Sequence, residues 1–181
     1  MDTNPPTRLI HHSREKDPEA FGLLVSQTRN TAFQTALRIV GNREDANDIV
    51  QEAYVRLWNS FQNYNPSLPF NAWFRQIIRN LAIDCLRRRK RTHIPLNEEI
   101  IPPNIENPAT ILENNQLTDT IRNWIPTLPH TQQKVFIMRD IENLSISEVQ
   151  AESGLSVASI KTNLHLARKK LRIHLSNYGY K

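Results

Sequence analysis

The chain has 181 residues, of which 39% are hydrophobic and 23% are charged, and its formal net charge is +5. This length suits one large domain or two small ones, and the composition excludes wholesale disorder. A single cysteine, Cys85, excludes an internal disulfide. Without a signal-peptide core or a long apolar run, the sequence predicts a cytoplasmic protein with no membrane insertion.

Charge and proline are unevenly distributed along the chain. Residues 1–92 carry 14 basic and 9 acidic side chains, and residues 111–181 carry 9 basic and 6 acidic ones. Residues 93–110 carry 3 acidic side chains and no basic ones. Prolines cluster from Pro95 to Pro129, where helix interiors would not tolerate them. We therefore predict a flexible N-terminal tail (1–18), a helical domain (19–92), a Pro-rich acidic linker (93–110), a second helical domain (111–176) and a C-terminal tail (177–181).

Apolar residues recur at steps of three and four, with no sustained alternation, so the sequence predicts an all-α fold. The first stripe runs from Phe21 to Val40 and stops at Gly41. A second helix follows Asn42, whose side chain can cap it together with Asp45. Its apolar face comprises Ala46, Ile49, Val50, Ala53 and Leu57, while Asp45, Asp48, Gln51 and Glu52 form an acidic edge.

The acidic edge allows two interpretations. Carboxylates three and four residues apart share a helix face and could ligate a metal ion, as in a metal-dependent nuclease acting through Asp45, Asp48 and Glu52. No histidine lies nearby in the sequence and no second carboxylate cluster complements them. We therefore favour a solvated or protein-docking edge and predict no metal site. The pair His11-His12, in the predicted tail, also has no matching ligand pattern.

A polar loop from Asn63 to Pro69 precedes a long helix that passes through Trp73, Ile77, Leu81 and Cys85 and ends in the run Arg87 to Arg91. Basic side chains follow phosphates and aromatic faces support unstacked bases, a combination that suits single-stranded or opened DNA. Trp73 lies on the apolar stripe, so we expect it in the core. The terminal cations also complement the helix macrodipole.

The second lobe contains a helix ending near Trp124, another from His130 to Asp140, and then the pattern of a helix-turn-helix. A short helix meets a turn at Gly154, and Ser156 caps a helix that runs to about Leu175. The outward residues of that helix carry base-edge and phosphate chemistry: Ser159, Lys161, Thr162, Asn163, His165 and Arg168. A solvated helical hairpin is the alternative.

The sequence predicts no catalytic residue, no cofactor and no enzymatic activity. Only 4 glycines occur, which excludes a Gly-rich phosphate loop. Cys85 lies on an apolar stripe without a nearby histidine base, so it does not resemble a nucleophile.

Two motif sets resemble the extracytoplasmic-function sigma factors of bacterial RNA polymerase, in the sigma-70 family. The segments from Asp45 to Tyr54, Pro69 to Phe74 and Ile78 to Asp84, with the following arginine run, are similar to the promoter-melting domain. Leu128-Pro129 and the segment from Leu144 to Leu171 are similar to the promoter-binding domain. The resemblance covers about Phe21 to Leu175.

This resemblance implies partners and sites. Core RNA polymerase would bind Asp45, Asp48, Gln51 and Glu52. The minus-ten promoter element would bind Tyr64, Asn65, Asn80, Asp84, Arg87 and Arg88. The minus-thirty-five element would bind Ser156, Ser159, Lys161, Thr162, Asn163, His165 and Arg168. An inhibitory anti-sigma factor is also implied.

The chain departs from the family pattern at three positions in the second lobe. Asn163 and Leu166 stand where many relatives have arginine, and Gln150 replaces a small residue where the two helices are expected to cross.

An extended linker of residues 93–110 would reach at most about 60 Å, on the order of 17 base pairs, so one chain can contact two promoter elements. A transcriptional regulator that acts without core polymerase remains the alternative function.

Overall fold

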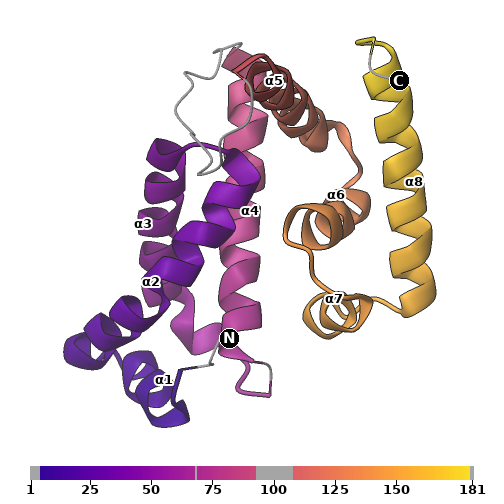
Figure 1. Cartoon of the computed structure of the whole chain (residues 1–181). Coiled ribbons are helices and arrows are strands. Elements are labelled where there is room, and N and C mark those ends of the chain that lie inside the picture. Colours follow the sequence, from indigo (N-terminus) through magenta and orange to yellow (C-terminus); the bar gives the residue numbers. More distant parts are fainter. Residues whose placement is uncertain (1–4, 68, 93–107, 180–181) are drawn as a thin grey trace. The chain divides into compact units, whose positions relative to one another are not determined.

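The computed structural model describes residues 5–67, 69–92 and 108–179 (Figure 1). All regular structure in these ranges is helical, which confirms the predicted all-α class. The chain divides into two compact units, and the division falls within a helix, between Asp84 and Cys85. Most of the predicted linker, residues 93–107, lies outside the described residues. None of the described helices is long and apolar enough to cross a membrane.

The N-terminal unit is built around three long helices that lie side by side (Figure 1). Its elements are α1 (Thr7–Arg14), α2 (Pro18–Val40), α3 (Arg43–Ser60), the 3₁₀ turn η1 (Phe61–Asn63) and the part of α4 (Phe70–Thr92) up to Asp84. The predicted boundary between the first two long helices is confirmed. Gly41 adopts φ 83°, and the side chain of Asn42 accepts a hydrogen bond from the Asp45 backbone N–H at 2.8 Å.

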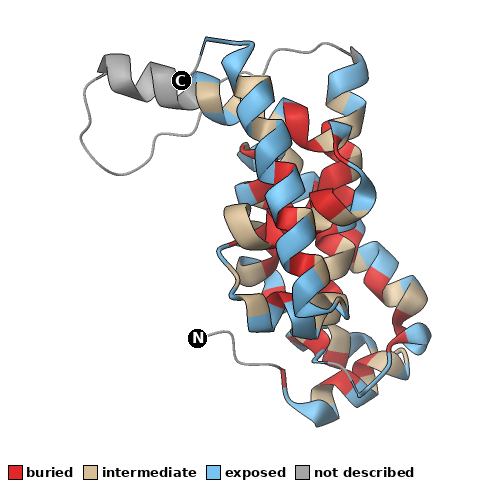
Figure 2. Ribbon diagram, turned by 90° about the vertical axis from the view of Figure 1, so that its right-hand side faces the viewer, coloured by how far each residue is buried: buried red, intermediate tan, exposed pale blue. Residues whose placement is uncertain are grey.

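The core of this unit follows the predicted stripes of α2 and α3, whose inner faces are buried (Figure 2). In α4 Leu81 and Cys85 are buried as predicted, but in the first half of the helix the buried face is shifted by one residue. Phe70, Phe74 and Ile78 are buried, whereas Trp73 and Ile77 are half-buried. The reason is aromatic packing, because Phe70 and Phe74 stack at 5.8 Å between ring centroids and turn that face of α4 inward.

The predicted N-terminal tail is in large part a docked helix. In α1 the side chains of Ile10 and Ser13 are buried, three residues apart on one face. Asp17 then caps α2, accepting hydrogen bonds from the backbone N–H groups of Glu19 and Ala20. The tail prediction failed because eight residues with two apolar positions carry little periodic signal, and the helix depends on packing against α2.

The C-terminal unit consists of shorter helices around a small core. Its elements are α5 (Pro108–Trp124), the 3₁₀ turn η2 (Ile125–Thr127), α6 (His130–Phe136), the π-helical turn η3 (Ile137–Ile141), α7 (Ile146–Ser153) and α8 (Val157–Ser176). The first residues of α5 belong to the predicted linker. Helices α6, α7 and α8 pack around Val135, Met138, Val149, Ile160 and Leu164.

Helices α7 and α8 form the predicted helix-turn-helix. Ser145 and Glu148 make a complete capping box at the start of α7, and Gly154 ends it with φ 71°. Ser156 caps α8 by accepting a hydrogen bond from the Ser159 backbone N–H at 3.2 Å. Gln150, expected where the two helices cross, is exposed instead. Val149 fills the core position, because the helix period places its neighbour outside.

We expect Gly154→Ala to destabilise the helix-turn-helix by roughly 1–2 kcal/mol, because a side chain disfavours the left-handed backbone even where space is open. Hydrogen exchange of α7 and α8 should accelerate about 5- to 30-fold. Gly22→Ala is the matched control: this glycine lies inside α2 with open space around it, so the change should stabilise α2 by about 0.5–1 kcal/mol. Stabilisation by Gly154→Ala would contradict its role as the left-handed end of α7, and destabilisation by Gly22→Ala would disqualify the control.

Candidate nucleic-acid interface

The outward face of α8 presents polar and cationic side chains one helical turn apart. Lys161, Thr162 and His165 are exposed, as predicted, and their spacing places them on one face. Exposed Lys169 and Arg172 continue in the direction of the C-terminus. This surface offers donors and acceptors beside cations, which are the groups that read base edges and bind phosphates.

Three predicted DNA contacts on α8 instead hydrogen-bond to the helix itself. The amide nitrogen of Asn163 donates to the Ser159 backbone carbonyl at 2.9 Å and to the Ser159 hydroxyl at 3.3 Å, and both residues are half-buried. Ser156 holds the N-terminus of α8 as its cap. The Ser156 cap is as predicted from the sequence, whereas the outward periodicity of Ser159 and Asn163 did not reveal their contact with each other, because short polar side chains compete readily for nearby backbone groups.

Arg168, predicted to bind phosphate, forms a bidentate ion pair with Asp140 of η3. Its Nε donates to Oδ2 at 3.0 Å and its Nη2 to Oδ1 at 2.5 Å. These hydrogen bonds raise the pKa of Arg168 above its usual value. The ion pair joins α8 to the segment before α7 and gives Arg168 a structural role. Local sequence patterns do not reveal this role, because the two residues are 28 positions apart.

In the N-terminal unit, the loop after η1 is anchored by an aromatic cluster. Tyr64, a predicted DNA contact, is only 5% exposed, and its ring centroid lies 5.0 Å from that of Trp73 and 5.9 Å from that of Phe70. Burial raises the pKa of the Tyr64 hydroxyl. The structure therefore assigns Tyr64 to the support of the loop. Asn65, the next residue, is exposed, and its side chain accepts the Ser67 backbone N–H at 3.0 Å.

The predicted polar residues of α4 follow one another at steps of three and four. Asn80 and Arg88 are exposed, and Asp84 and Arg87 are half-buried. Arg79, beside Asn80, is buried, with 2% exposure. The spacing of the exposed and half-buried residues gives α4 a polar face that carries an amide and a carboxylate before its terminal cations.

The acidic edge of α3 is partly exposed. Asp48, Gln51 and Glu52 are exposed, and Glu52 accepts a hydrogen bond from the Arg56 Nε at 2.9 Å. Asp45 is half-buried and faces its capping partner, with 3.4 Å between Oδ2 and the side-chain nitrogen of Asn42. The Asp45 carboxylate therefore supports the Asn42 cap at the N-terminus of α3.

Sequence reasoning missed two features beside this edge. Val55, four residues after Gln51, is 56% exposed. The sequence could have indicated this exposed apolar residue, because its helical spacing places it beside the charged side chains. A groove of about 670 Å³ lies between α2 and α3. Among the residues that line it are Arg29, Arg43, Asn47 and Gln51. Only helix packing brings Arg29 and Arg43 together, so no local pattern reveals the groove.

The structure gives no support to a metal-dependent nuclease built on α3. Within the described ranges, the side chains that converge in the manner of metal ligands are His11, His12 and Glu15, and none of Asp45, Asp48 and Glu52 belongs to such a group. The Asp45 carboxylate accepts a hydrogen bond from the cap residue Asn42, and Glu52 is paired with Arg56.

Two protein-family models match the chain, one in each half. The model described as Sigma-70 region 2 matches residues 24–92, which include α3, the anchored loop and α4. The model described as Sigma-70, region 4 matches residues 119–171, which include the helix-turn-helix.

Several known proteins are similar to most of this chain. The ECF RNA polymerase sigma factor SigE of Mycolicibacterium smegmatis is 31% identical over 159 residues, covering 86% of this chain, which spans only 62% of that protein. SigW of Bacillus subtilis is 26% identical, with 93% and 95% of the two chains covered. The solved structure of CnrH in complex with the cytosolic domain of CnrY matches with a TM-score of 0.57 and 26% identity, covering 94% and 96%. The chain therefore belongs to the sigma-70 family as an RNA polymerase sigma factor of the extracytoplasmic-function type, a class of proteins that are not enzymes.

Proposed function

We propose that this chain binds core RNA polymerase, directs it to a two-part promoter and helps to open the duplex. The observation that carries the proposal is the exposed polar and cationic face of α8 in a helix-turn-helix, within a chain matched by both sigma regions. Binding energy does the work, because unstacking bases costs a few kcal/mol per step and base capture with phosphate contacts must offset that cost.

At the upstream, minus-thirty-five element, Lys161, Thr162 and His165 contact base edges in the major groove. Lys169 and Arg172, further along the exposed face, bind phosphates in place of Arg168, which is engaged with Asp140. Leu166, 39% exposed, offers an apolar contact to a thymine methyl group.

At the minus-ten element, the exposed amides of Asn65 and Asn80 hydrogen-bond to an unstacked base. An amide carries both donors and acceptors, so it can pair with a Watson–Crick edge. Arg88 binds the adjacent phosphate, while Tyr64 and Trp73 hold the loop in place through their ring contact. The Pro-rich acidic segment of residues 93–110 acts as the tether between the two DNA-binding regions.

Core polymerase docks on the exposed part of the α3 edge, Asp48, Gln51 and Glu52, with Val55 as an apolar contact beside them. The acidic side chains complement a basic surface, which steers association. We also expect an inhibitory anti-sigma factor that covers these surfaces. The similar CnrH was solved in complex with the cytosolic domain of CnrY, which supports regulation by a bound protein.

The test is transcription of fragmented genomic DNA by bacterial core polymerase, with and without this chain, followed by sequencing of RNA 5′ ends. We expect start sites that require both components and that share two upstream motifs at a fixed spacing. Specific initiation that persists undiminished without the chain would overturn the proposal.

A gel-shift experiment distinguishes the alternative of a regulator acting alone. Under the proposal, the chain binds promoter duplex weakly until core polymerase is added, whereas a regulator binds tightly by itself. A nuclease would cleave DNA on addition of magnesium or manganese and lose this activity in Asp48→Ala. Under the proposal, the same substitution weakens polymerase binding instead.

We expect Asn80→Ala to impair promoter melting while leaving polymerase binding unchanged. Asn80 is exposed on α4 and the lost base contact is worth about 1–3 kcal/mol, so open complexes should decrease about 5- to 150-fold. Permanganate reactivity of unpaired thymines measures melting, and co-elution with core polymerase measures binding. Asn177→Ala removes an exposed amide elsewhere and serves as the control. Equal loss of melting and polymerase binding would contradict the assigned role.

A further inference from the structure

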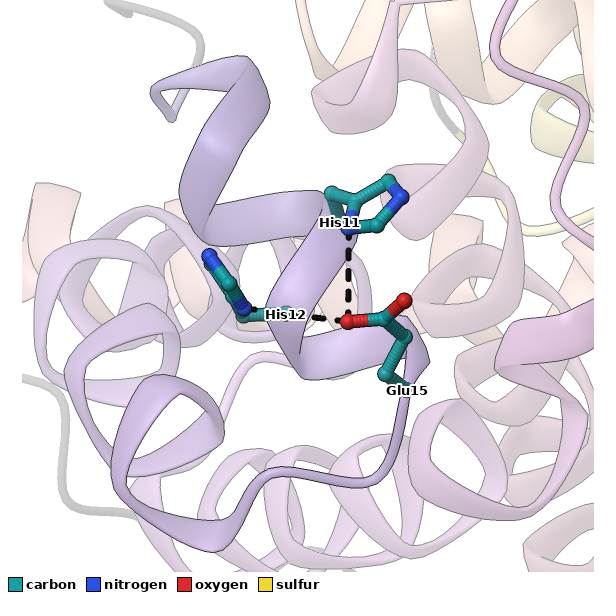
Figure 3. Close-up of side chains that lie close together, drawn as sticks. All are labelled: His11, His12 and Glu15. Carbon is teal, nitrogen blue, oxygen red and sulfur yellow. Dashed lines mark ion pairs between the residues drawn. The ribbon is translucent and has the colours of Figure 1, made fainter.

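Helix α1 carries a set of metal-ligand side chains in its last turn. Nδ1 of His11 lies 3.4 Å from Oε2 of Glu15, and Nδ1 of His12 lies 3.7 Å from the same oxygen (Figure 3). One ligand atom from each of the three residues falls within 4.8 Å of the others. The helix produces this convergence, since residues three and four apart share a face.

The α1 backbone that presents these ligands is held in place by its neighbours. Nη2 of Arg14 donates to the Gln62 carbonyl at 3.1 Å. Nζ of Lys16 donates to the Trp58 carbonyl and lies 4.6 Å from the centroid of the Trp58 ring. These contacts dock α1 against α3 and η1. Because the cationic groups of Arg14 and Lys16 are engaged in these contacts, they repel a bound cation less.

The donor separations are close to those of ligands around one small metal ion. Zinc binds imidazole nitrogen and carboxylate oxygen at about 2.0–2.2 Å in tetrahedral geometry, which places two ligand atoms about 3.4 Å apart. The His11 pair already has this separation, and the His12 pair exceeds it by a few tenths of an ångström. The ligand nitrogens of the two histidines lie within 4.8 Å of each other, and rotation of the exposed His11 imidazole and the half-buried His12 imidazole would bring them closer.

The electrostatics of this end of α1 favour a cation. The C-terminus of a helix carries the negative end of the macrodipole, and the three side chains stand in the last turn or at the cap. Two imidazoles and one carboxylate are typical of zinc and its first-row neighbours, whereas magnesium and calcium prefer oxygen ligands.

We propose that His11, His12 and Glu15 form a binding site for one divalent first-row transition-metal ion, such as Zn²⁺. Three protein ligands leave at least one coordination position for water or for a donor from a bound partner. The ion would join the last turn of α1 to its cap, immediately before Asp17 begins α2. Metal binding would therefore stabilise the last turn of α1, a property independent of promoter recognition.

The test is titration of the chelator-treated full chain with ZnCl₂, followed by calorimetry and by NMR of the imidazole nitrogens. We expect one ion per chain, with shifts at His11 and His12 and none at His130, His165 or His174. His11→Gln and His12→Gln should each weaken binding at least about tenfold, and Glu15→Gln should weaken it as well. His130→Gln, an exposed histidine on α6, is the matched control and should bind as the wild type does.

Two results would overturn the proposal. The first is a chain without saturable one-to-one binding. The second is binding that is unchanged in the double variant His11→Gln/His12→Gln, which would identify the ion as adventitious. Should a variant fold poorly, the NMR shifts of the wild-type chain decide alone, because they name the histidines that contact the ion. Hydrogen exchange of the α1 backbone provides an independent measure and should slow when Zn²⁺ is added.

Discussion

Asp48→Lys should weaken the binding of this chain to core RNA polymerase by about 30-fold or more. The residue is exposed in the middle of α3, a helix whose other face is buried, so its position is rigid while its charge is accessible. Under the proposed docking, reversing this charge removes an attraction to core polymerase and adds a repulsion, and the few residues that dominate an interface contribute about 2 kcal/mol or more each. Calorimetry or fluorescence anisotropy with purified core polymerase measures the change.

The neighbouring acids should respond in a defined order. Glu52→Lys should weaken binding less than Asp48→Lys, because Arg56 already pairs with Glu52. Asp45→Asn should act mainly on the stability of α3, because the Asp45 carboxylate lies in the first turn and accepts a hydrogen bond from the side chain of the cap, Asn42. Glu19→Lys, an exposed reversal in the first turn of α2, is the control and should leave polymerase binding unchanged. Equal losses in Asp48→Lys and Glu19→Lys would show that overall charge, rather than the α3 edge, governs binding.

Lys161→Ala and Thr162→Ala should each reduce discrimination of the upstream promoter element by about 1–3 kcal/mol, or 5- to 150-fold. Both side chains are exposed on α8, one turn after its cap, where a recognition helix presents its side chains to base edges. Competition between promoters that differ only in the upstream element, measured with the assembled holoenzyme, quantifies the effect. Thermal stability should stay the same, because neither side chain is buried.

Lys170→Ala provides a matched control on the same helix. The ammonium group of Lys170 donates to the Gln132 side chain at 2.9 Å, so it is engaged with α6. We expect this variant to retain promoter discrimination. If Lys161→Ala instead lowers affinity equally for all upstream sequences and reduces the salt slope by about one, Lys161 binds phosphate and the base-edge assignment is wrong.

The recognition surface on α8 shows where sequence reasoning succeeds and where it stops. The outward positions of Lys161, Thr162 and His165 follow from helix period alone. The period does not show what each side chain contacts once it is outside the core. Asn163 hydrogen-bonds to the Ser159 carbonyl of the same helix, and Arg168 pairs with Asp140. A pattern of apolar and polar positions contains no information about either partner.

What the sequence determined by itself was the helical class, the two halves of the chain and the helix boundaries at Gly41, Asn42, Gly154 and Ser156. These features depend on caps, turns and periodicity, which act over a few residues. Packing between distant segments decided the rest. It buried Tyr64 among aromatic rings, formed the groove between α2 and α3, and docked α1 through the contact of Arg14 with Gln62. A side chain's surroundings are set by which elements meet, and only the tertiary structure brings those elements together.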